Sequence, residues 1–326
     1  MNRRIDSFTV TRSRSISSEQ IIGVEPSSTK NCALFGSWRR CCYLGVWVAL
    51  GISGGIAFSG NPALAQSNIV PDNTLGADSS LVMPNFNGLP VEVIAGGTQR
   101  GQNLFHSFQE FNVSENRGAY FLSPDAAIEN ILARVTGGNR SDILGTLGTF
   151  GNSQPNLFLI NPNGIIFGPN ASLDVGGSFV ATTANAVGLG ETGRFSASEP
   201  QTSNLLAINP NAFFFNQFSN QGQIVNRSTA TTTVLGFFVN GLPSSYGLQV
   251  LGGRSLLLLG GNVNVNGGIV FAPGGRVELG GLASTGTVGL NVDGNNLHLA
   301  FPDNVARADV SLTNRAVVST RGEGGG

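Results

Sequence analysis

The chain has 326 residues, of which only 11% are charged, and its formal net charge is −1. Seven of the 18 basic residues but only three of the 19 acidic ones lie in the first 65 positions, so the remainder has a net charge of about −5 and no lysine. Such a chain is poorly suited to binding nucleic acid or an anionic membrane surface. All three cysteines also lie in the first 65 positions, so the remainder must be held by packing and backbone hydrogen bonds.

The first 65 residues are predicted to be an extended signal peptide. Two arginines precede an apolar run, Tyr43–Phe58, and Ala63 and Ala65 then form an Ala-x-Ala cleavage site. The segment is longer than the ~15–30 residues of an ordinary signal peptide. A membrane anchor is the alternative, but the apolar run is shorter than the ~20 residues that span a bilayer. Cleavage after Ala65 gives a mature chain that begins at Gln66.

Beyond this segment the apolar residues recur in short runs broken by Gly, Asn, Asp or Pro, such as NLFLI, GIIFG, RSLLLLGG and NVNVNGG. Several runs alternate strictly: Val263 and Val265 are set between asparagines, and Val277 and Leu279 alternate with Arg276 and Glu278. Alternation with a period of two predicts strands that bury one face. The segment 125–134 is a weak candidate for a short helix, so the mature chain is expected to be almost entirely β.

An internal repeat indicates how the strands are arranged. The stretch FLINPNGIIF (Phe158–Phe167) returns 48 residues later as LAINPNAFFF (Leu206–Phe215). Periods of ~20–50 residues are typical of solenoids, and 48 residues suit two coils of roughly 20–25 residues each. We therefore predict an all-β fold, a right-handed parallel β-helix (solenoid). An antiparallel sandwich is the alternative, but hairpin signals with matched flanks are scarce.

An amino-terminal β cap is expected to cover the open end of the solenoid, because exposed sheet edges invite aggregation. The predicted cap is Ile69–Phe121. Its apolar residues Leu104, Phe105, Phe108 and Phe111 would cover the first coil. Further along, the side chains expected to stack inside the coils are Leu159, Ile165, Phe167, Leu173 and Val175.

The mature sequence contains no arrangement typical of a catalytic or metal site. His106 and His298 are far apart in apolar surroundings, and no His/Cys cluster has the spacing of metal ligands. Asp293 and Asp303 could approach each other across neighbouring coils, but both lie in turn-forming sequences. We expect no catalytic residue, no metal and no cofactor, and we expect the protein not to be an enzyme.

The corner Asn161-Pro162-Asn163-Gly164 is the most distinctive motif of the repeat. Proline favours an extended conformation for Asn161 and fixes its own φ, and Asn163-Gly164 can then take a tight turn. A turn between two strands is the plain interpretation. A recognition motif is the alternative.

The run FLINPNGIIFGPNASLDVGGSFVATT resembles the amino-terminal secretion domain (haemagglutination activity domain) of filamentous haemagglutinin-like exoproteins of the two-partner secretion pathway. GGTQRGQNLFHSFQEFNV (Gly96–Val113), RVTGG (Arg134–Gly138) and ILGTL (Ile143–Leu147) are similar in order and spacing. The resemblance covers Ile69–Asn240. It places the family's Asn-Pro-Asn-Gly motif on Asn161, Pro162, Asn163 and Gly164. A second family motif falls on Asn139, Arg140, Ser141 and Asp142, with Arg140 where the family has proline.

The resemblance implies an export route and a domain order. The Sec machinery would deliver the chain to the periplasm of a Gram-negative envelope, and an outer-membrane β-barrel transporter with POTRA domains would recognise the amino-terminal domain. Residues 1–65 are then the signal peptide, 66–240 the two-partner secretion domain and 241–326 continuing coils of a longer or shortened adhesin.

The function expected from these features is that of a secreted, cell-surface adhesin. Its receptor would be a glycan or a protein on a host or other cell. The alternatives are a β-helical enzyme acting on polysaccharides and a structural protein of the cell surface layer. The enzyme is the weaker of these, because its site needs clustered Asp with Arg, Lys or Ca²⁺, and the mature chain has no lysine and no acidic cluster.

Overall fold

The computed structural model describes residues 66–216, 222–231, 246–293, 296–303 and 305–322. Within these ranges the regular structure is almost entirely β, interrupted only by two short 3-10 turns, η1 (Phe86–Gly88) and η2 (Pro200–Thr202). The expectation of an all-β fold is confirmed. No helix in the described part of the chain is long and apolar enough to cross a membrane.

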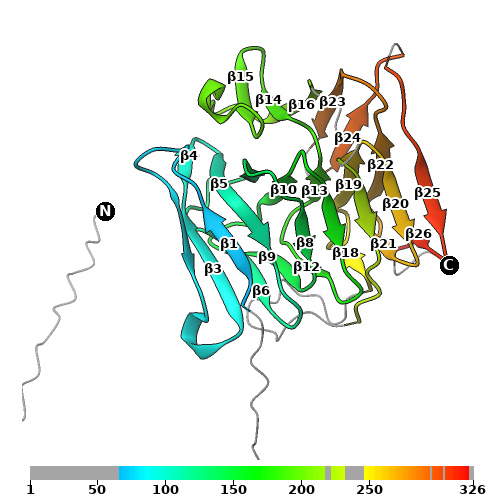
Figure 1. The fold of residues 1–326 in the computed structure, drawn as a ribbon, viewed down its shortest axis with the longest axis horizontal. Coiled ribbons are helices and arrows are strands. Elements are labelled where there is room, and N and C mark those ends of the chain that lie inside the picture. The colour runs from blue at the N-terminus through cyan, green and yellow to red at the C-terminus, as the bar shows by residue number, and fades with distance from the viewer. Residues whose placement is uncertain (1–65, 217–221, 232–245, 294–295, 304, 323–326) are drawn as a thin grey trace, which may run out of the picture. The chain divides into compact units, whose positions relative to one another are not determined.

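Parallel strands form three faces of a coil (Figure 1). The first face, sheet A, contains β1 (Asn68–Pro71), β5 (Asn103–Asn112), β7 (Asn130–Val135), β10 (Asn156–Ile160), β13 (Phe179–Thr182), β19 (Ser255–Gly260) and β22 (Arg276–Gly281), with β4 (Thr98–Arg100) beside β5. The second face, sheet C, contains β8 (Ser141–Ile143), β11 (Ile165–Phe167), β17 (Ile224–Asn226), β20 (Val263–Asn266) and β25 (Val310–Thr313). The third face is made first by sheet B and then by sheet E.

Sheet B contains β2 (Ser80–Met83), β3 (Val91–Gly96), β6 (Gly118–Ser123), β9 (Thr146–Gly151) and β12 (Ser172–Asp174). Sheet E contains β18 (Leu248–Gln249), β21 (Ile269–Phe271) and β26 (Val317–Ser319), and β18 lies against β12. Apart from β1, β2 and β4, which pair antiparallel, neighbouring strands within each of these sheets pair in parallel with their equivalents in the next coil. In sheet A, for example, Leu157 lies between Ile131 and Phe179, which are 26 residues before it and 22 after it. The parallel β-helix is thus confirmed, and its right hand stays a prediction.

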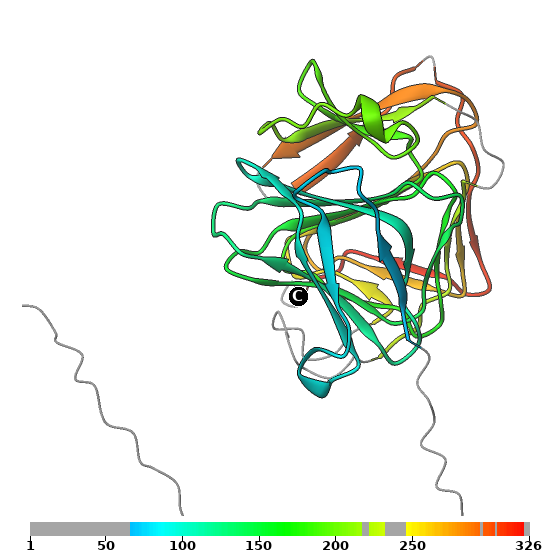
Figure 2. The same ribbon diagram turned by 60° about the vertical axis from the view of Figure 1, so that its left-hand side comes forward.

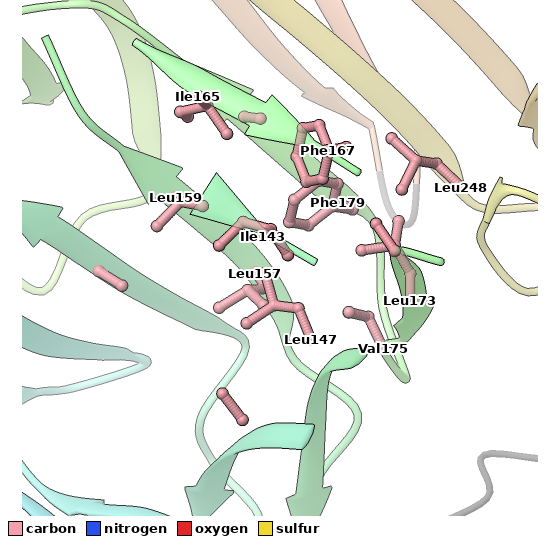
Figure 3. Packing of buried hydrophobic residues seen from close by; sticks show 14 of the residues in the cluster. Ile143, Leu147, Leu157, Leu159, Ile165, Phe167, Leu173, Val175, Phe179 and Leu248 are labelled. Atoms are coloured by element: carbon pink, nitrogen blue, oxygen red, sulfur yellow. The ribbon is translucent and has the colours of Figure 1, made fainter. Parts of the chain in front are cut away.

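The interior of the coil is a stack of apolar side chains (Figure 3). The five residues expected there are all buried, namely Leu159, Ile165, Phe167, Leu173 and Val175. In the close-up they converge with Ile143, Leu147 and Phe179 from the other faces and from neighbouring coils. Burying each such side chain contributes roughly 1.5–3 kcal/mol, so this stack is the main source of stability of the coil.

A fifth sheet, which was not expected from the sequence, covers the outer face of sheet A. Sheet D is antiparallel and contains β14 (Ala186–Leu189), β15 (Gly193–Ser196), β16 (Pro210–Phe215), β23 (Gly286–Asp293) and β24 (Asn296–Ala300). Two excursions from the coil supply these strands, one after β13 and one after β22. In Figure 2 the green and orange strands of this sheet lie together along the upper side.

Sheets A and D form a sandwich with its own apolar core. Consecutive residues of sheet A point to opposite faces, so Phe158 faces sheet D while Leu157 and Leu159 face the interior of the coil. The outward-facing residues include Phe105, Leu132, Phe158, Val180 and Leu257, and they meet Val187, Phe195, Phe213, Val288 and Leu297 of sheet D. This sandwich packs a mainly parallel sheet on an antiparallel one, so it differs from the antiparallel sandwich that is the alternative to the coil.

Two detailed expectations are corrected by this second core. Leu104, Phe108 and Phe111 do lie in the coil interior, but Phe105 faces sheet D, because it follows Leu104 directly along the strand. The segment 125–134 is not a helix, since β7 occupies its second half. Pairing of β7 with strands on both sides, and burial of both its faces, outweigh the local tendency. The cap is confirmed as antiparallel strands β1, β2 and β4 set against β5 and β3.

The second copy of the repeat does not begin another coil. Its residues Pro210–Phe215 form β16 of the antiparallel sheet. The carboxamide oxygen of Asn209 accepts hydrogen bonds from Gln102 Nε2 and Asn130 Nδ2, both at 2.8 Å. Asn130 belongs to a ladder of polar side chains along one end of sheet A, which runs through Asn103, Asn130, Asn156, Ser178 and Ser255. The second copy therefore fastens the first excursion to the coil.

Adjacent phenylalanines of β16 provide a test of the sandwich. Phe213 is fully buried against sheet A, whereas Phe214 is half-buried beside Arg194 on the other face. Phe213→Ala should lower the free energy of unfolding by about 3–5 kcal/mol, the usual range for a buried phenylalanine. Phe214→Ala should cost clearly less. Denaturant unfolding of both variants measures the difference, and equal small losses would mean that sheet D is not part of the cooperative fold.

Buried His106 predicts a sensitivity to acid. Burial lowers the pKa of His106 to about 3, from an ordinary value of 6.5, and its Nδ1 lies 3.1 Å from Ser80 Oγ. Between these pKa values the unfolded chain binds a proton that the folded chain does not, so stability falls as the pH drops below about 6.5. The expected slope is about 1.4 kcal/mol per pH unit.

Replacing the histidine isolates its contribution. His106→Phe should remove this part of the pH dependence, measured as the free energy of unfolding between pH 7 and pH 4. His298→Phe is the matched control, because the side chain of His298 is 51% exposed. A profile of His106→Phe identical to that of the natural chain would contradict the assignment.

Candidate functional site: a clasped corner and its groove

The Asn161–Gly164 corner joins β10 of sheet A to β11 of sheet C. Asn161 is fully buried, and its backbone N–H donates to the carbonyl of Thr182 in the following coil at 3.0 Å. Gly164 N donates back to Asn161 O at 3.1 Å, which closes the turn. The φ of Gly164 is 117°, a conformation that side-chain-bearing residues rarely adopt. The motif therefore ends in glycine for a conformational reason.

The Asn161 carboxamide fastens this corner to the coil before it. Its Nδ2 donates to Asn139 O and to Ser141 Oγ, both at 3.0 Å. Its Oδ1 accepts from the backbone N of Asn163 at 3.0 Å, the hydrogen bond of an Asx turn. The two sequence-predicted motifs are thus brought together: residues 139–142 supply the acceptors that the buried asparagine of residues 161–164 requires.

Asn163 adds to these hydrogen bonds from a less buried position. Together the bonds of Asn161 and Asn163 to residues 137–141 form what we call the clasp. Its Nδ2 donates to Gly137 O at 2.7 Å and to Asn161 Oδ1 at 3.2 Å. The residue is only half-buried, and its Oδ1 has no hydrogen-bond partner in the described ranges. Asn163 and Pro162 line a hollow of about 270 Å³ between the corner and sheet D. Asn163 also lines a second hollow on its other side.

That second hollow is a groove of about 820 Å³ outside β8 and β11, and both motifs line it. Arg140 and Asp142 form an exposed ion pair there, with Arg140 Nε 2.9 Å from Asp142 Oδ1. Asn139 Nδ2 donates to Glu110 Oε1 at 2.6 Å. Arg140, where the related motif has proline, leaves the clasp intact, because the groups that Asn161 uses belong to Asn139 and Ser141.

Sequence reasoning missed a buried arginine that ties three parts of the fold together. Arg134, in β7, is fully buried, and its donors reach Ser107 Oγ, Thr74 Oγ1, Ser203 Oγ and Ser196 O at 2.6–2.8 Å. The guanidinium also lies 4.4 Å from the centre of the Phe195 ring. Burial lowers its pKa to about 10, which the charge of nearby Asp72 opposes. The sequence did contain a sign of this burial, because Arg134, the arginine of RVTGG, lies inside the apolar run ILARV.

Asp72 belongs to the same network on the cap side. Burial opposes ionisation of its carboxyl, but hydrogen bonds from Thr136, Thr74 and Ser107 outweigh it and lower its pKa. Ser107 Oγ lies between the two charges, 2.8 Å from Asp72 Oδ2 and 2.8 Å from Arg134 Nε. The network joins cap, coil and first excursion, which is a structural role.

The remaining sequence candidates lie apart from this corner. His106 is packed in the coil, and His298 is exposed beside Glu278. Asp293 ends β23 opposite Asn296, at the turn into β24. Within the described residues, no three His, Cys, Asp or Glu side chains gather where they could hold a metal ion. Ala63 and Ala65 lie outside the described residues, and the carbonyl of Gln66 accepts a hydrogen bond from Ser114 Oγ.

Parallel coils that are clasped at their corners define a β-solenoid. Residues 67–326 match the family described as the TPS secretion domain, where TPS stands for two-partner secretion, and the chain belongs to this family. The resemblance seen in the sequence is confirmed. Exoproteins of this family are secreted across the outer membrane of Gram-negative bacteria, and the domain implies a cognate outer-membrane transporter.

Two proteins of Haemophilus influenzae are similar to parts of the chain. A heme/hemopexin-binding protein is 39% identical over 88 residues, which are 26% of this chain and 9% of that protein. The crystal structure of the HMW1 secretion domain aligns with a TM-score of 0.49 at 18% identity, over 77% of this chain and 57% of that one. The chain thus spans less than two thirds of either protein, and the fold assigned above rests on its own strand pairing.

The clasp predicts different costs for its two asparagines. Asn161→Ala removes a fully buried carboxamide with both ends bonded, and should lower the free energy of unfolding by about 2–4 kcal/mol. Asn163→Ala removes a half-buried one and should cost only about 1 kcal/mol. Asn161 is thus a buried turn residue, unlike the exposed asparagines of ordinary turns. Denaturant unfolding tests the order, and equal costs would show that burial does not separate the two residues.

Proposed function

We propose that this chain is a secreted adhesin-type exoprotein whose amino-terminal domain directs its export and begins folding of the β-helix outside the cell. Its signal peptide, residues 1–65, would use the Sec machinery. A transporter with POTRA domains would then recognise the segment that contains Asn161–Gly164. Residues 66–240 are assigned to the secretion domain and 241–326 to continuing coils.

The choice of Asn163 over Asn161 as the recognition residue rests on one observation. Asn161 is needed by the fold itself, because both ends of its carboxamide are hydrogen-bonded inside the clasp. Asn163 is half-buried, borders two hollows and keeps an oxygen without a partner among the described residues. The folded coil depends little on the Asn163 carboxamide, which supports a role for this residue before folding, when the unfolded chain meets the transporter.

An adhesin is favoured over the two alternatives on the character of the surface. An enzyme that acts on polysaccharides needs a pair of carboxyl groups free to act on the substrate. In the groove beside the motif, Asp142 is paired with Arg140 and Glu110 accepts from Asn139, and the other polar lining residues are mostly carboxamides. A structural role in a surface layer would need no hollow of this kind. The receptor is proposed to be a glycan or protein outside the cell, and nucleic acid is disfavoured by the acidic net charge.

A matched pair of variants tests the export role. Asn163→Ala should reduce secretion through the cognate transporter at least tenfold, although it costs only about 1 kcal/mol of stability. Asn211→Ala, at the equivalent position of the repeat, should be secreted normally. Asn211 is exposed in the excursion, and within the described residues its side chain donates only to Gly190 O, at 3.2 Å. The measurement is the amount of protein in the medium of cells that produce both partners.

A third variant separates recognition from stability. Ile165→Val trims a buried side chain next to the corner, costs about 0.5–1.5 kcal/mol, and leaves residues 139–142 and 161–164 unchanged. If the Asn161–Gly164 segment itself is recognised, Ile165→Val is secreted better than Asn163→Ala at comparable stability. Secretion that falls in step with the free energy of unfolding across all three variants would mean that the corner is architecture alone.

A further inference from the structure

The groove outside β8 and β11 is unusually rich in carboxamide side chains. Five line it, namely Asn68, Asn112, Asn139, Asn163 and Gln223. Its volume of about 820 Å³ lies within the range of roughly 300–1,000 Å³ that is typical of small-ligand sites. Leu144 and Ile166, both half-buried, supply apolar surface between them. The groove therefore combines an apolar base with neutral polar walls.

Its charges are nearly balanced within the groove itself. Arg140 is paired with Asp142 at 2.9 Å, and Glu110 adds a second carboxylate, which accepts from Asn139. The three ionisable side chains thus sum to a formal charge of −1. An anionic ligand would meet no unpaired cation here, so a neutral ligand is favoured.

The groove also offers no free strand edge to a peptide. β8 is an edge strand of sheet C, but residues 112–113 already occupy that edge. Val113 N donates to Asp142 O at 2.9 Å, Leu144 N donates to Val113 O at 2.8 Å, and Asp142 N donates to Asn112 Oδ1 at 2.9 Å. Recognition by strand addition needs these groups unpaired. The ligand must instead be held by side chains.

The carboxamide donors and acceptors in the groove that lack a partner are suited to bind hydroxyl groups. Among the described residues, Asn112 Nδ2 is a donor without a partner, and Asn139 Oδ1 and Asn163 Oδ1 are acceptors without partners. A hydroxyl both donates and accepts, so neighbouring hydroxyls of one sugar ring can satisfy both kinds of group. Buried sugar C–H groups would pack on the apolar base.

We propose that this groove binds a neutral oligosaccharide. The inference rests on the proposed function, because the groove forms only in the folded domain, after export. Its test therefore uses residues outside both export motifs. Asn112→Asp keeps the oxygen that accepts from Asp142 N and replaces the ligand-facing donor. Asn170→Asp, the same change at an exposed residue outside the groove, is the control.

Binding is measured by calorimetry on the secreted full chain with neutral hexasaccharides of glucose, mannose and N-acetylglucosamine, and with hexagalacturonate as the anionic probe. At least one neutral probe should bind at millimolar concentration or below, and hexagalacturonate should not. Asn112→Asp should weaken that binding about tenfold, and Asn170→Asp should leave it unchanged.

Three results would overturn the proposal: no heat with any neutral probe, tighter binding of hexagalacturonate, or equal loss in both variants. Secretion of Asn112→Asp is recorded alongside. Normal secretion together with lost binding supports the groove independently of the export motif. Normal secretion with no binding by the natural chain refutes the groove and leaves the export proposal standing.

Discussion

The fold depends on pairing the polar groups at corners of the coil with groups of neighbouring coils. Short parallel strands satisfy their own backbones along each face, but a corner leaves amide and carbonyl groups that burial would make costly. The carboxamide of Asn161 meets this demand by donating to Asn139 O and Ser141 Oγ. The ladder that includes Asn130 does the same at the other end of sheet A. Once the corners are fixed, the apolar side chains of successive coils can stack.

The two apolar cores, one inside the coil and one between sheets A and D, leave different patterns in the sequence. The VNVN of β20 in sheet C alternates because only one face of this strand is apolar. Central strands of sheet A carry continuous apolar runs, such as LLLL in β19 and LFLI in β10, because sheet D covers their outer face, whereas the last strand, β22, alternates. A continuous run typically means burial on both faces. The coil was therefore predictable from alternation, and a second covering layer was indicated by the runs that do not alternate.

Other features could not be read from local sequence. The two INPN copies share their turn chemistry, yet only the first makes a corner of the coil, since Gly164 adopts a φ of 117° and the second copy has Ala212 inside a strand. What fixes the second copy is Asn130, 79 residues away from Asn209. The groove has the same origin, because its walls come from 110–114, 138–144 and 163–166, which only the coiling brings together.

This non-local character bears on the order of folding in a chain that emerges amino terminus first. The outer face of sheet A carries Phe105, Leu132 and Phe158 long before β23 and β24 follow to complete sheet D. Buried Arg134 likewise needs Ser196 and Ser203 from the first excursion. Until these partners arrive, the coil has an exposed apolar face and an incompletely bonded charge, both unfavourable. The Asn161 corner, in contrast, finds all its side-chain partners within 137–163, so these hydrogen bonds can form early, and only its backbone N–H waits for Thr182 O of the following coil.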